Sequence, residues 1–452
     1  MNSTAGAKQD AFILTGSFIA ICRAPRYLAE LHSRGLTVLL ATPARWRADA
    51  EASLAEPGHP ATAADEIAFV AGSPDHEGSF NAGAIAAARD WQRRYRIVGA
   101  YAVGETMVEP TGLLADALGL PGPGLRASRV CRSKYLQRWY LPDASPPSTV
   151  IPAGGRDTTD LREVSYPAVL KPASRHSSSG VVTVPDESAL RVAMAEYPGH
   201  ETLLAESRVW GQEYSVETLT QDGTILFASV TRKDTNEAGG EAFVELAHSV
   251  PADGTAAGQV LAANEAVLRR LDMRDGITHA EWRVDADGVP RLMEVAARTP
   301  GDGLCVLYEL ATGAPLEPVI VDIALGVPTE YPAPRRFTRQ VYVEADHGVL
   351  DDVRVDWPGI TPTWVGEAGQ WPEIEPGAAD DPATLRAVLV LKERGAWLGP
   401  LRSSDDRAVT ALIDAPNPAE LDELEARVRA AITIAVSAPG TAADEGTKEC
   451  AA

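Results

Sequence analysis

The sequence contains few cysteines and aromatic residues and no long apolar run. Four cysteines, Cys22, Cys131, Cys305 and Cys450, are scattered over 452 residues and match no zinc or redox spacing. We therefore expect reduced thiols in a cytoplasmic protein. The first residues, MNSTAGAKQD, have no apolar signal core, and no run approaches the roughly 20 residues of a membrane span. Neither export nor membrane insertion is expected.

Positive charge is also scarce, with 41 Lys and Arg against 63 Asp and Glu and a net charge of −22. This charge repels phosphate backbones and anionic lipid surfaces, so neither nucleic acid nor a membrane is an expected partner. An anionic ligand would need a local cluster of cations or a metal ion. The length itself predicts about three domains.

Alternating strand and helix patterns run from Phe12 to about residue 105. Short apolar runs alternate with helical stretches such as 25–34 and 82–94, which predicts a parallel sheet covered by helices. Gly16 follows the first strand, but the glycine fingerprint of a dinucleotide fold is missing, which argues against a dehydrogenase. A Pro- and Gly-rich stretch at 120–124 then predicts the end of an N-terminal βαβ domain, residues 1–124.

The remainder predicts an α+β architecture. Two hairpin signals, Asp222-Gly223 and Asp287-Gly288, predict an antiparallel sheet with packed helices in residues 125–330. Short strands with Pro and Gly turns, then a helix from about Glu420 to Ile434, predict a further domain over 331–438. The Ala-, Gly- and acid-rich residues 439–452 are predicted to be disordered.

The second hairpin brings two acids together. A two-residue type I′ turn at Asp287-Gly288 pairs Ala286 with Val289 and, counting back along both strands, places Glu281 opposite Glu294. Two carboxylates so close repel, and Mg²⁺ compensates them naturally because it prefers oxygen ligands. The alternative is a solvated sheet face on which Arg283 or Arg298 balances the charge.

Earlier segments offer cations and small residues for a nucleotide. A strand ends at Lys171 and is followed by a Ser-rich loop, Ser177, Ser178, Ser179 and Gly180, whose backbone N–H groups could approach phosphates. A flexible hairpin is the alternative. Further on, Glu206 and Glu213 flank a turn at Gly211. Backbone groups at this turn could bind an adenine, and Glu213 could bind a ribose. The alternative is an exposed loop that carries the two acids. Lys134 and Arg138 share one helix face and could be surface charges.

In this order, these residues resemble the ATP-grasp superfamily over about residues 12–435. The resemblance implies an ATP-grasp fold with an N-terminal βαβ domain and a C-terminal closing domain. It also implies that Lys134 and Lys171 contact the phosphates of ATP under the loop 177–180. By the same resemblance, Glu206 lies at the adenine hinge and Glu213 binds the ribose. Glu281 and Glu294 are implied to bridge the magnesium ions. Where many members carry Asn, this chain has Ala296, which puts one metal contact in doubt.

Within the superfamily the chain is similar to L-amino-acid ligases of the bacilysin-synthetase type. The segments EVAARTPGDGL, FVELAHSVPA and GPLRSSDDRAVTALIDA carry this likeness, with Arg298 in the first and Glu245 and His248 in the second. The likeness implies an ADP-forming ligase that makes a peptide bond through an acyl phosphate in the biosynthesis of a specialised metabolite such as an antibiotic. Arg298 would hold the substrate carboxylate and the oxyanion, and Glu245 with His248 would receive the proton of the amine.

The substrates stay open at this point. Gly301 and Asp302 fall where the resembling ligases line the first substrate's pocket, and Asp302 would suit a basic group or only cap a turn. The amine could come from a free amino acid or a peptide, and a homodimer is possible by analogy. Alternatives are an ATP-grasp ligase for a nucleotide precursor or a D-amino acid, or a regulator that binds ATP without turnover.

Overall fold

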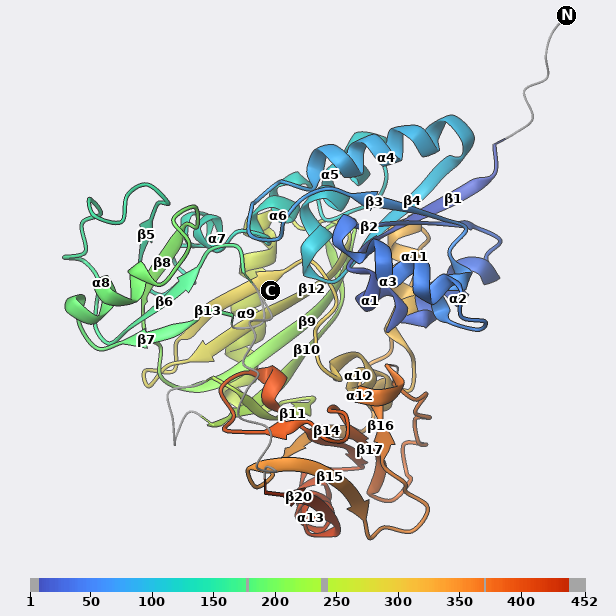
Figure 1. Ribbon diagram of the computed structural model, residues 1–452, viewed down its shortest axis with the longest axis vertical. Helices are drawn as coiled ribbons and strands as arrows, with labels where there is room; N and C mark the ends of the chain where they lie inside the picture. The colour runs from blue at the N-terminus through green and yellow to red at the C-terminus, as the bar shows by residue number, and fades with distance from the viewer. Residues whose placement is uncertain (1–7, 176–178, 237–242, 370, 439–452) are drawn as a thin grey trace, which may run out of the picture. The chain divides into compact units, whose positions relative to one another are not determined.

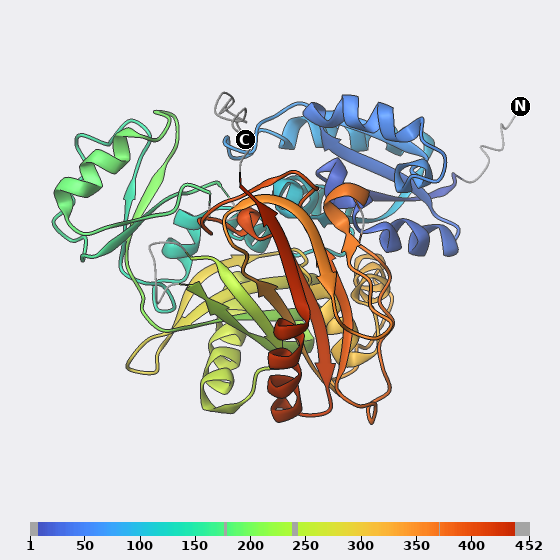
Figure 2. The same ribbon diagram turned by 60° about the horizontal axis from the view of Figure 1, so that its bottom comes forward.

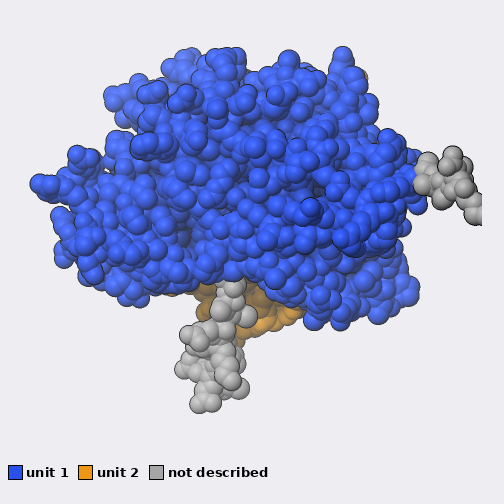
Figure 3. All heavy atoms as spheres, turned by 90° about the horizontal axis from the view of Figure 1, so that it is seen from above, with its two compact units in different colours: residues 1–233, 250–334 blue, residues 234–249, 335–452 orange. Residues whose placement is uncertain are grey.

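The computed structural model describes residues 8–175, 179–236, 243–369 and 371–438 (Figure 1). Two compact units share the chain (Figure 3). Unit 1 comprises Met1–Lys233 and Val250–Pro334, and unit 2 comprises Asp234–Ser249 and Arg335–Ala452. The predicted disordered segment 439–452 lies outside the described residues. The predicted domain boundaries at 124, 330 and 438 stay a prediction.

Unit 1 begins with a four-stranded parallel sheet in the order β3-β2-β1-β4. Its central strands β1 and β2 are buried almost throughout, as expected for strands covered on both faces by helices. This confirms the predicted βαβ series and the helices predicted at 25–34 and 82–94. The elements are β1 (Asp10–Gly16), α1 (Phe18–Cys22), α2 (Pro25–Ser33), β2 (Thr37–Pro43), α3 (Arg47–Leu54), β3 (Glu66–Val70), α4 (Asn81–Arg94), β4 (Arg96–Val103) and α5 (Val108–Leu118).

A small antiparallel sheet in the order β5-β8-β6-β7 follows in unit 1. Helix α8 packs on it through Leu190 and Met194, which share a core cluster with Leu170 and Ala205 of the strands. The Ser-rich loop connects β6 to β7, as the sequence predicts, but residues 176–178 lie outside the described part of the chain. The elements are β5 (Ser148–Ile151), β6 (Ala168–Pro172), β7 (Val182–Val184), α8 (Glu187–Ala195) and β8 (Leu203–Ser207).

The largest sheet portion of unit 1 has the order β13-β12-β9-β10 and is antiparallel. One face packs against helix α9 (Figure 2). The core between them includes Trp282 and Val260. The other face is polar. The elements are α6 (Leu125–Val130), α7 (Lys134–Tyr140), β9 (Gln212–Gln221), β10 (Thr224–Thr235), α9 (Gly254–Leu271), β12 (Gly276–Val284), β13 (Pro290–Ala296), α10 (Leu304–Thr312) and α11 (Leu316–Leu325).

The two predicted hairpins differ in outcome. Asp222 and Gly223 join β9 to β10 with φ of 49° and 73°, as a two-residue type I′ turn requires, and Gln221 pairs with Thr224. This prediction is confirmed. The turn predicted at Asp287-Gly288 is wrong, because residues 285–289 form a longer loop closed by a hydrogen bond from the Asp285 N–H to the Val289 carbonyl at 3.1 Å.

Glu281 nevertheless pairs with Glu294, because a second irregularity corrects the register. Nearest the loop, Val284 pairs with Pro290, one residue away from the predicted register. A bulge between Glu281 and Trp282 then shifts the pairing by one residue. The predicted opposition of the two acids is therefore confirmed, although the turn from which it was predicted is not.

Among the described residues, no single helix is long and apolar enough to cross a membrane. Helices α10 and α11 together reach that length and composition, but they are bent by 98° at their junction. Both bury apolar side chains inside unit 1, including Leu307, Leu310, Ile320 and Ile323.

Unit 2 contains strands in the order β11-β14-β19-β17-β16 and a second sheet, β18-β15-β20. Helix α13 packs on the strands through Leu421, Leu424 and Val428 (Figure 2). The predicted helix near 420–434 is present but ends earlier, since Ile432 begins a strand. The elements are β11 (Glu245–Val250), β14 (Phe337–Val343), β15 (Gly348–Val355), β16 (Thr363–Trp364), α12 (Val365–Ala368), β17 (Thr384–Val390), β18 (Trp397–Leu398), β19 (Val409–Ala415), α13 (Pro418–Ala431) and β20 (Ile432–Ser437).

Candidate active site

The polar face of the sheet β13-β12-β9-β10 carries the candidate site. Side chains alternate between the two faces of a strand, so every second residue on these strands points to the same side. The pairing between neighbouring strands places acidic and basic side chains beside one another on this face. The residues of this face are Glu294 on β13, His279, Glu281 and Arg283 on β12, Glu213, Ser215 and Glu217 on β9, and Thr231 and Lys233 on β10.

Three cationic groups surround the opposed acids. Lys134 donates to Glu294 at 3.0 Å, Lys233 donates to Glu281 at 2.5 Å, and Nε2 of His279 lies 3.3 Å from Glu281. Burial alone would raise the pKa of Glu281, but Lys233 and His279 outweigh it and hold that pKa well below its usual range. Glu281 is therefore ionised.

The arginines expected to balance this pair have other partners. Arg283 donates to Glu213 at 2.6 Å, and Arg298 donates to Glu105 at 2.8 Å. The alternative, a solvated sheet face on which Arg283 or Arg298 balances the acids, is therefore wrong. Lys233 and His279 balance the charge of Glu281 instead. The sequence reasoning missed both residues, although the two-residue period of the strand around Glu281 could have indicated His279.

Each of the two acids keeps one oxygen for a further ligand. Lys233 and His279 both bind Oε1 of Glu281, and Lys134 binds Oε1 of Glu294. Within the part of the chain that the structure describes, the Oε2 atoms accept no hydrogen bond from protein. Their side chains are 30% and 26% exposed, so both are partly accessible. Two partly accessible carboxylates on paired residues fit the preference of Mg²⁺ for hard oxygen ligands. The buried Ala296 adds no ligand.

A second charged cluster is buried beside β8. Arg138 donates to both oxygens of Glu206 at 2.5 and 3.2 Å, and Lys171 lies 2.6 Å from the same carboxylate. Burial disfavours the charge of Glu206, yet Arg138 and Lys171 lower its pKa to about 2. Burial likewise lowers the pKa of Lys171. Lys134 and Arg138 are thus buried ion-pair members, and their interpretation as surface charges is wrong.

The loop that follows Lys171 is fixed at both ends. At its start, the carbonyl of Arg175 accepts a bond from Lys134 at 2.7 Å, and at its end Gly180 accepts one from the Tyr197 hydroxyl at 2.7 Å. Gly180 has a φ of 71°, which favours glycine. Ser179 is exposed, whereas the predicted residues Ser177 and Ser178 lie outside the described residues.

The predicted nucleotide hinge has the expected backbone course. Strand β8 ends at Ser207, and β9 begins at Gln212 directly after Gly211. A Cβ at Gly211 would lie 1.9 Å from the carbonyl oxygen of Val284, so only glycine fits there. Glu213 is ion-paired with Arg283 and Lys233 rather than free in a loop.

Arg298 is fixed at the start of the loop that leads to α10. Besides Glu105 it donates to the carbonyl of Thr299 at 2.7 Å. Burial opposes the charge of Glu105, but Arg298 and Arg132 lower its pKa, so the pair is ionic. The sequence offered no pattern that pointed to Glu105. Gly301 and Asp302 are exposed in the same loop, and Asp302 has a φ of 51°.

Glu245 and His248 belong to unit 2, on β11. Ser404 donates to Glu245 at 2.9 Å, and Arg407 lies 3.5 Å from the same oxygen. His248 is 1% exposed and packs edge-on against the ring of Tyr342. The two predicted residues thus lie on one strand.

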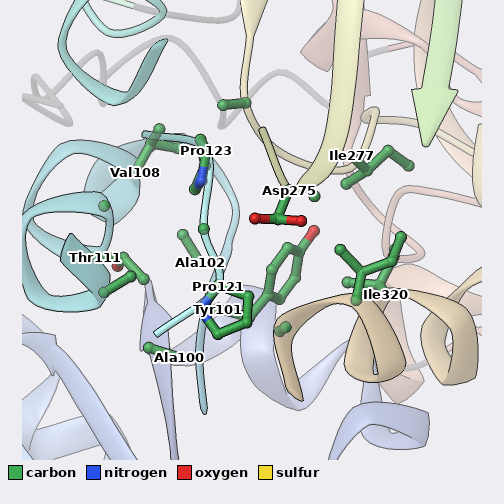
Figure 4. Close-up of a pocket in the computed structure, with 17 residues that line it drawn as sticks. Ala100, Tyr101, Ala102, Val108, Thr111, Pro121, Pro123, Asp275, Ile277 and Ile320 are labelled. Carbon is green, nitrogen blue, oxygen red and sulfur yellow. The ribbon is translucent and has the colours of Figure 1, made fainter. Parts of the chain in front are cut away.

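A cavity of about 30 Å³ lies elsewhere in unit 1 (Figure 4). Its walls are mainly apolar, and Asp275 is the carboxylate that lines it. Burial raises the pKa of Asp275, which accepts a hydrogen bond from the backbone of Asp222 at 2.8 Å. This volume holds about one or two water molecules and excludes a nucleotide.

Comparisons with known proteins bear on the family and the fold of the chain. Residues 164–306 match the ATP-grasp domain family. A D-alanine–D-alanine ligase from Dechloromonas aromatica (strain RCB) is 32% identical over 99 residues, which are 21% of this chain and 33% of that protein. The match thus spans about a third of the length of that curated relative.

Among solved structures, an L-amino acid ligase from Bacillus licheniformis has a TM-score of 0.69 at 20% identity, over 95% of this chain and 99% of its own. A phosphoribosylglycinamide synthetase from Anaerococcus prevotii has a TM-score of 0.62 at 12% identity, over 95% and 100%. The chain therefore contains an ATP-grasp domain and has the ATP-grasp fold along nearly its whole length, as the resemblance implied. Its neighbours in that fold include ligases for quite different substrates.

Proposed function

We propose that this chain is an ADP-forming carboxylate–amine ligase that uses Mg²⁺ and ATP to join an amino acid to the amine of a second amino acid or a peptide. The observation that carries the proposal is the accessible Glu281–Glu294 pair, surrounded by Lys134, Lys233 and His279 within an ATP-grasp domain. The full-length likeness to an L-amino acid ligase favours amino acid substrates over other carboxylates.

The chemistry follows from the poor reactivity of a carboxylate, whose leaving group would be oxide. A carboxylate oxygen takes the γ-phosphoryl group of ATP, and ADP leaves with the electron pair of the broken P–O bond. A cation on Glu281 and Glu294 would neutralise charge on the phosphoryl oxygens. Lys134, which donates to Glu294 and to the carbonyl of Arg175, would bind the transferring group, and Lys171, paired with Glu206, would bind the nucleotide.

The amine then attacks the acyl carbon, and phosphate leaves with the electrons of the C–O bond. Arg298, fixed by Glu105, presents a planar guanidinium that suits the substrate carboxylate and the oxyanion that develops from it. The ammonium form of the second substrate loses one proton before its amine attacks and a second proton as the amide forms, and Glu245 and His248 are the candidate acceptors. Asp302, exposed in the loop after Arg298, favours an acyl substrate with a basic side chain.

The test is ADP release by the full-length protein with Mg-ATP and pairs of amino acids or an amino acid with short peptides, with products identified by mass spectrometry. Product formation from two amino substrates supports the ligase, and hydroxylamine should intercept the acyl phosphate as a hydroxamate. ATP binding without turnover in a broad screen would instead support a regulator.

Glu294→Ala should abolish ADP release in a protein that still folds, although buried Lys134 loses its carboxylate partner and the thermal unfolding midpoint falls. Glu265→Ala serves as a matched control, since that acid is exposed on α9 and pairs with Arg269 of the same helix. Full turnover by the Glu294 variant would contradict the metal assignment.

A further inference from the structure

Glu217 is a buried carboxylate to which the proposed chemistry gives no role. It lies on β9, 1% exposed, on the same face as Glu281. Its two oxygens accept hydrogen bonds from Nδ1 of His279 at 2.7 Å, the Ser215 hydroxyl at 2.9 Å, the Thr231 hydroxyl at 3.0 Å and the Tyr308 hydroxyl at 2.5 Å. A carboxylate bound on all sides in this way is fixed in one orientation.

His279 lies between this carboxylate and Glu281. Nδ1 faces Glu217 at 2.7 Å, and Nε2 faces Oε1 of Glu281 at 3.3 Å. Ionised carboxylates only accept hydrogen bonds, so both ring nitrogens of His279 act as donors. A ring held at both ends, with the buried Glu217 at one of them, has a single orientation.

The bond to His279 has a direct consequence for Glu281. His279 and Lys233 both bind Oε1, from β12 and β10 respectively, so the carboxyl group is oriented by donors on neighbouring strands. This orientation leaves Oε2 for a ligand. Without His279, Lys233 alone would hold one oxygen, and the carboxyl group could rotate about its last side-chain bond.

We infer that Glu217 and His279 are positioning residues that orient Glu281 for metal binding; this inference depends on the proposed magnesium site. Outer residues that fix metal-binding carboxylates commonly change metal affinity strongly when removed. We call the connected residues Tyr308, Glu217, His279 and Glu281 the Glu217 bridge.

The Glu217 bridge also reaches the substrate loop. Tyr308 lies on α10, the helix that directly follows the loop with Arg298 and Asp302. Its hydroxyl contacts Glu217 and also lies 2.9 Å from the Thr231 hydroxyl. The helix after the proposed acyl-substrate loop is thereby attached to the carboxylate that orients the metal ligand.

The test measures Mn²⁺ binding to the full-length protein in the presence of ADP by electron paramagnetic resonance. His279→Asn and Glu217→Gln should each weaken Mn²⁺ binding about 10- to 100-fold, while ADP affinity measured without metal stays unchanged. The double variant should bind Mn²⁺ no more weakly than His279→Asn, because Glu217 acts through His279. Thr218→Val is the matched control: this buried neighbour on β9 bonds Asn264 instead, and its replacement should leave Mn²⁺ binding unchanged.

Wild-type-like Mn²⁺ binding by a folded His279→Asn protein would overturn the Glu217 bridge but not the proposed function. Failure of the wild-type protein to bind Mn²⁺ with ADP would overturn both. Should the His279 variant fail to fold, Tyr308→Phe removes only one hydroxyl from the far end of the bridge. It should still weaken Mn²⁺ binding about 2- to 10-fold, as expected for loss of one hydrogen bond, and an unchanged affinity would count against the bridge.

Discussion

The buried ion pair at Glu206 couples ionisation of this residue to folding. Its pKa falls from an ordinary 4.5 to about 2 in the folded chain, because Arg138 and Lys171 outweigh burial. A lowered folded-state pKa means that the stabilisation is complete above about pH 4.5 and is lost as the pH falls toward about 2. Glu206→Gln removes this titration and leaves two buried cations without a counter-charge.

We expect Glu206→Gln to lower the free energy of unfolding by about 3–5 kcal/mol at pH 7, the usual cost of breaking a buried pair. Between pH 4.5 and pH 3 its thermal unfolding midpoint should fall less steeply than that of the wild type. Midpoints measured by circular dichroism across this range would check both. Parallel curves for the two proteins would show that Glu206 does not titrate differently in the folded chain.

Much of the site could be predicted at the level of single residues. The order of Lys134, Lys171, Glu206, Glu281, Glu294 and Arg298 along the chain carried the resemblance, and the structure places the first five in two charged clusters. Lys233 and Glu105 could not be found in this way, because their importance depends on pairing between distant segments. Strand periodicity gives the face of a residue but not its neighbour on the next strand.

Close packing between α5 and α6 depends on one glycine. A Cβ at Gly112 would lie 1.8 Å from the Oγ and 2.3 Å from the Cβ of Ser128, which is 1% exposed. A change of rotamer can move Oγ but not Cβ, so the helices themselves must separate. We expect Gly112→Ala to reduce the free energy of unfolding by about 1–3 kcal/mol, as overpacking does.

Gly258, inside α9, is the matched control for that change. No atom of the described residues outside its own helix backbone lies within 4 Å of the place that a Cβ would take, so Gly258→Ala should stabilise the chain by about 0.5–1 kcal/mol through helix propensity. Urea unfolding of both variants gives the comparison, and Gly112→Ala combined with Ser128→Gly should recover most of the loss. If the two substitutions changed the free energy of unfolding equally, the close contact between α5 and α6 would contribute nothing to the cost of Gly112→Ala.

The acidic hairpin shows what sequence can give for an element. The strand patterns and the Asp-Gly turn indicated the existence of the hairpin, and its two acids do pair. The loop, however, is longer than two residues, and the bulge beside Glu281 compensates for that. A bulge is set by how the bent strand packs against its neighbours, which local sequence does not encode. The Asp222-Gly223 turn itself has two residues and follows its sequence pattern, although the pairing of its strands also shifts, between Ile225 and Phe227.

For the molecule as a whole, a net charge of −22 opposes the binding of an anionic nucleotide. The proposed function requires the local cations and the metal to overcome this field. Nucleotide binding should therefore depend on metal, and it should stabilise the folded chain by mass action, by about 2.7 kcal/mol when the ligand is at 100 times its dissociation constant.

We expect Mg-ADP to raise the thermal unfolding midpoint by more than ADP in EDTA does. Both measurements need the same ionic strength, because salt screens the net charge. Glu281→Gln should retain the shift given by ADP alone, since Lys171 and Glu206 are intact, and should lose the increment due to Mg²⁺. Differential scanning fluorimetry over a range of ADP concentrations separates the two effects. Equal shifts with Mg²⁺ and with EDTA would mean that the cations of the chain bind the nucleotide alone, and that Glu281 and Glu294 hold no metal beside it.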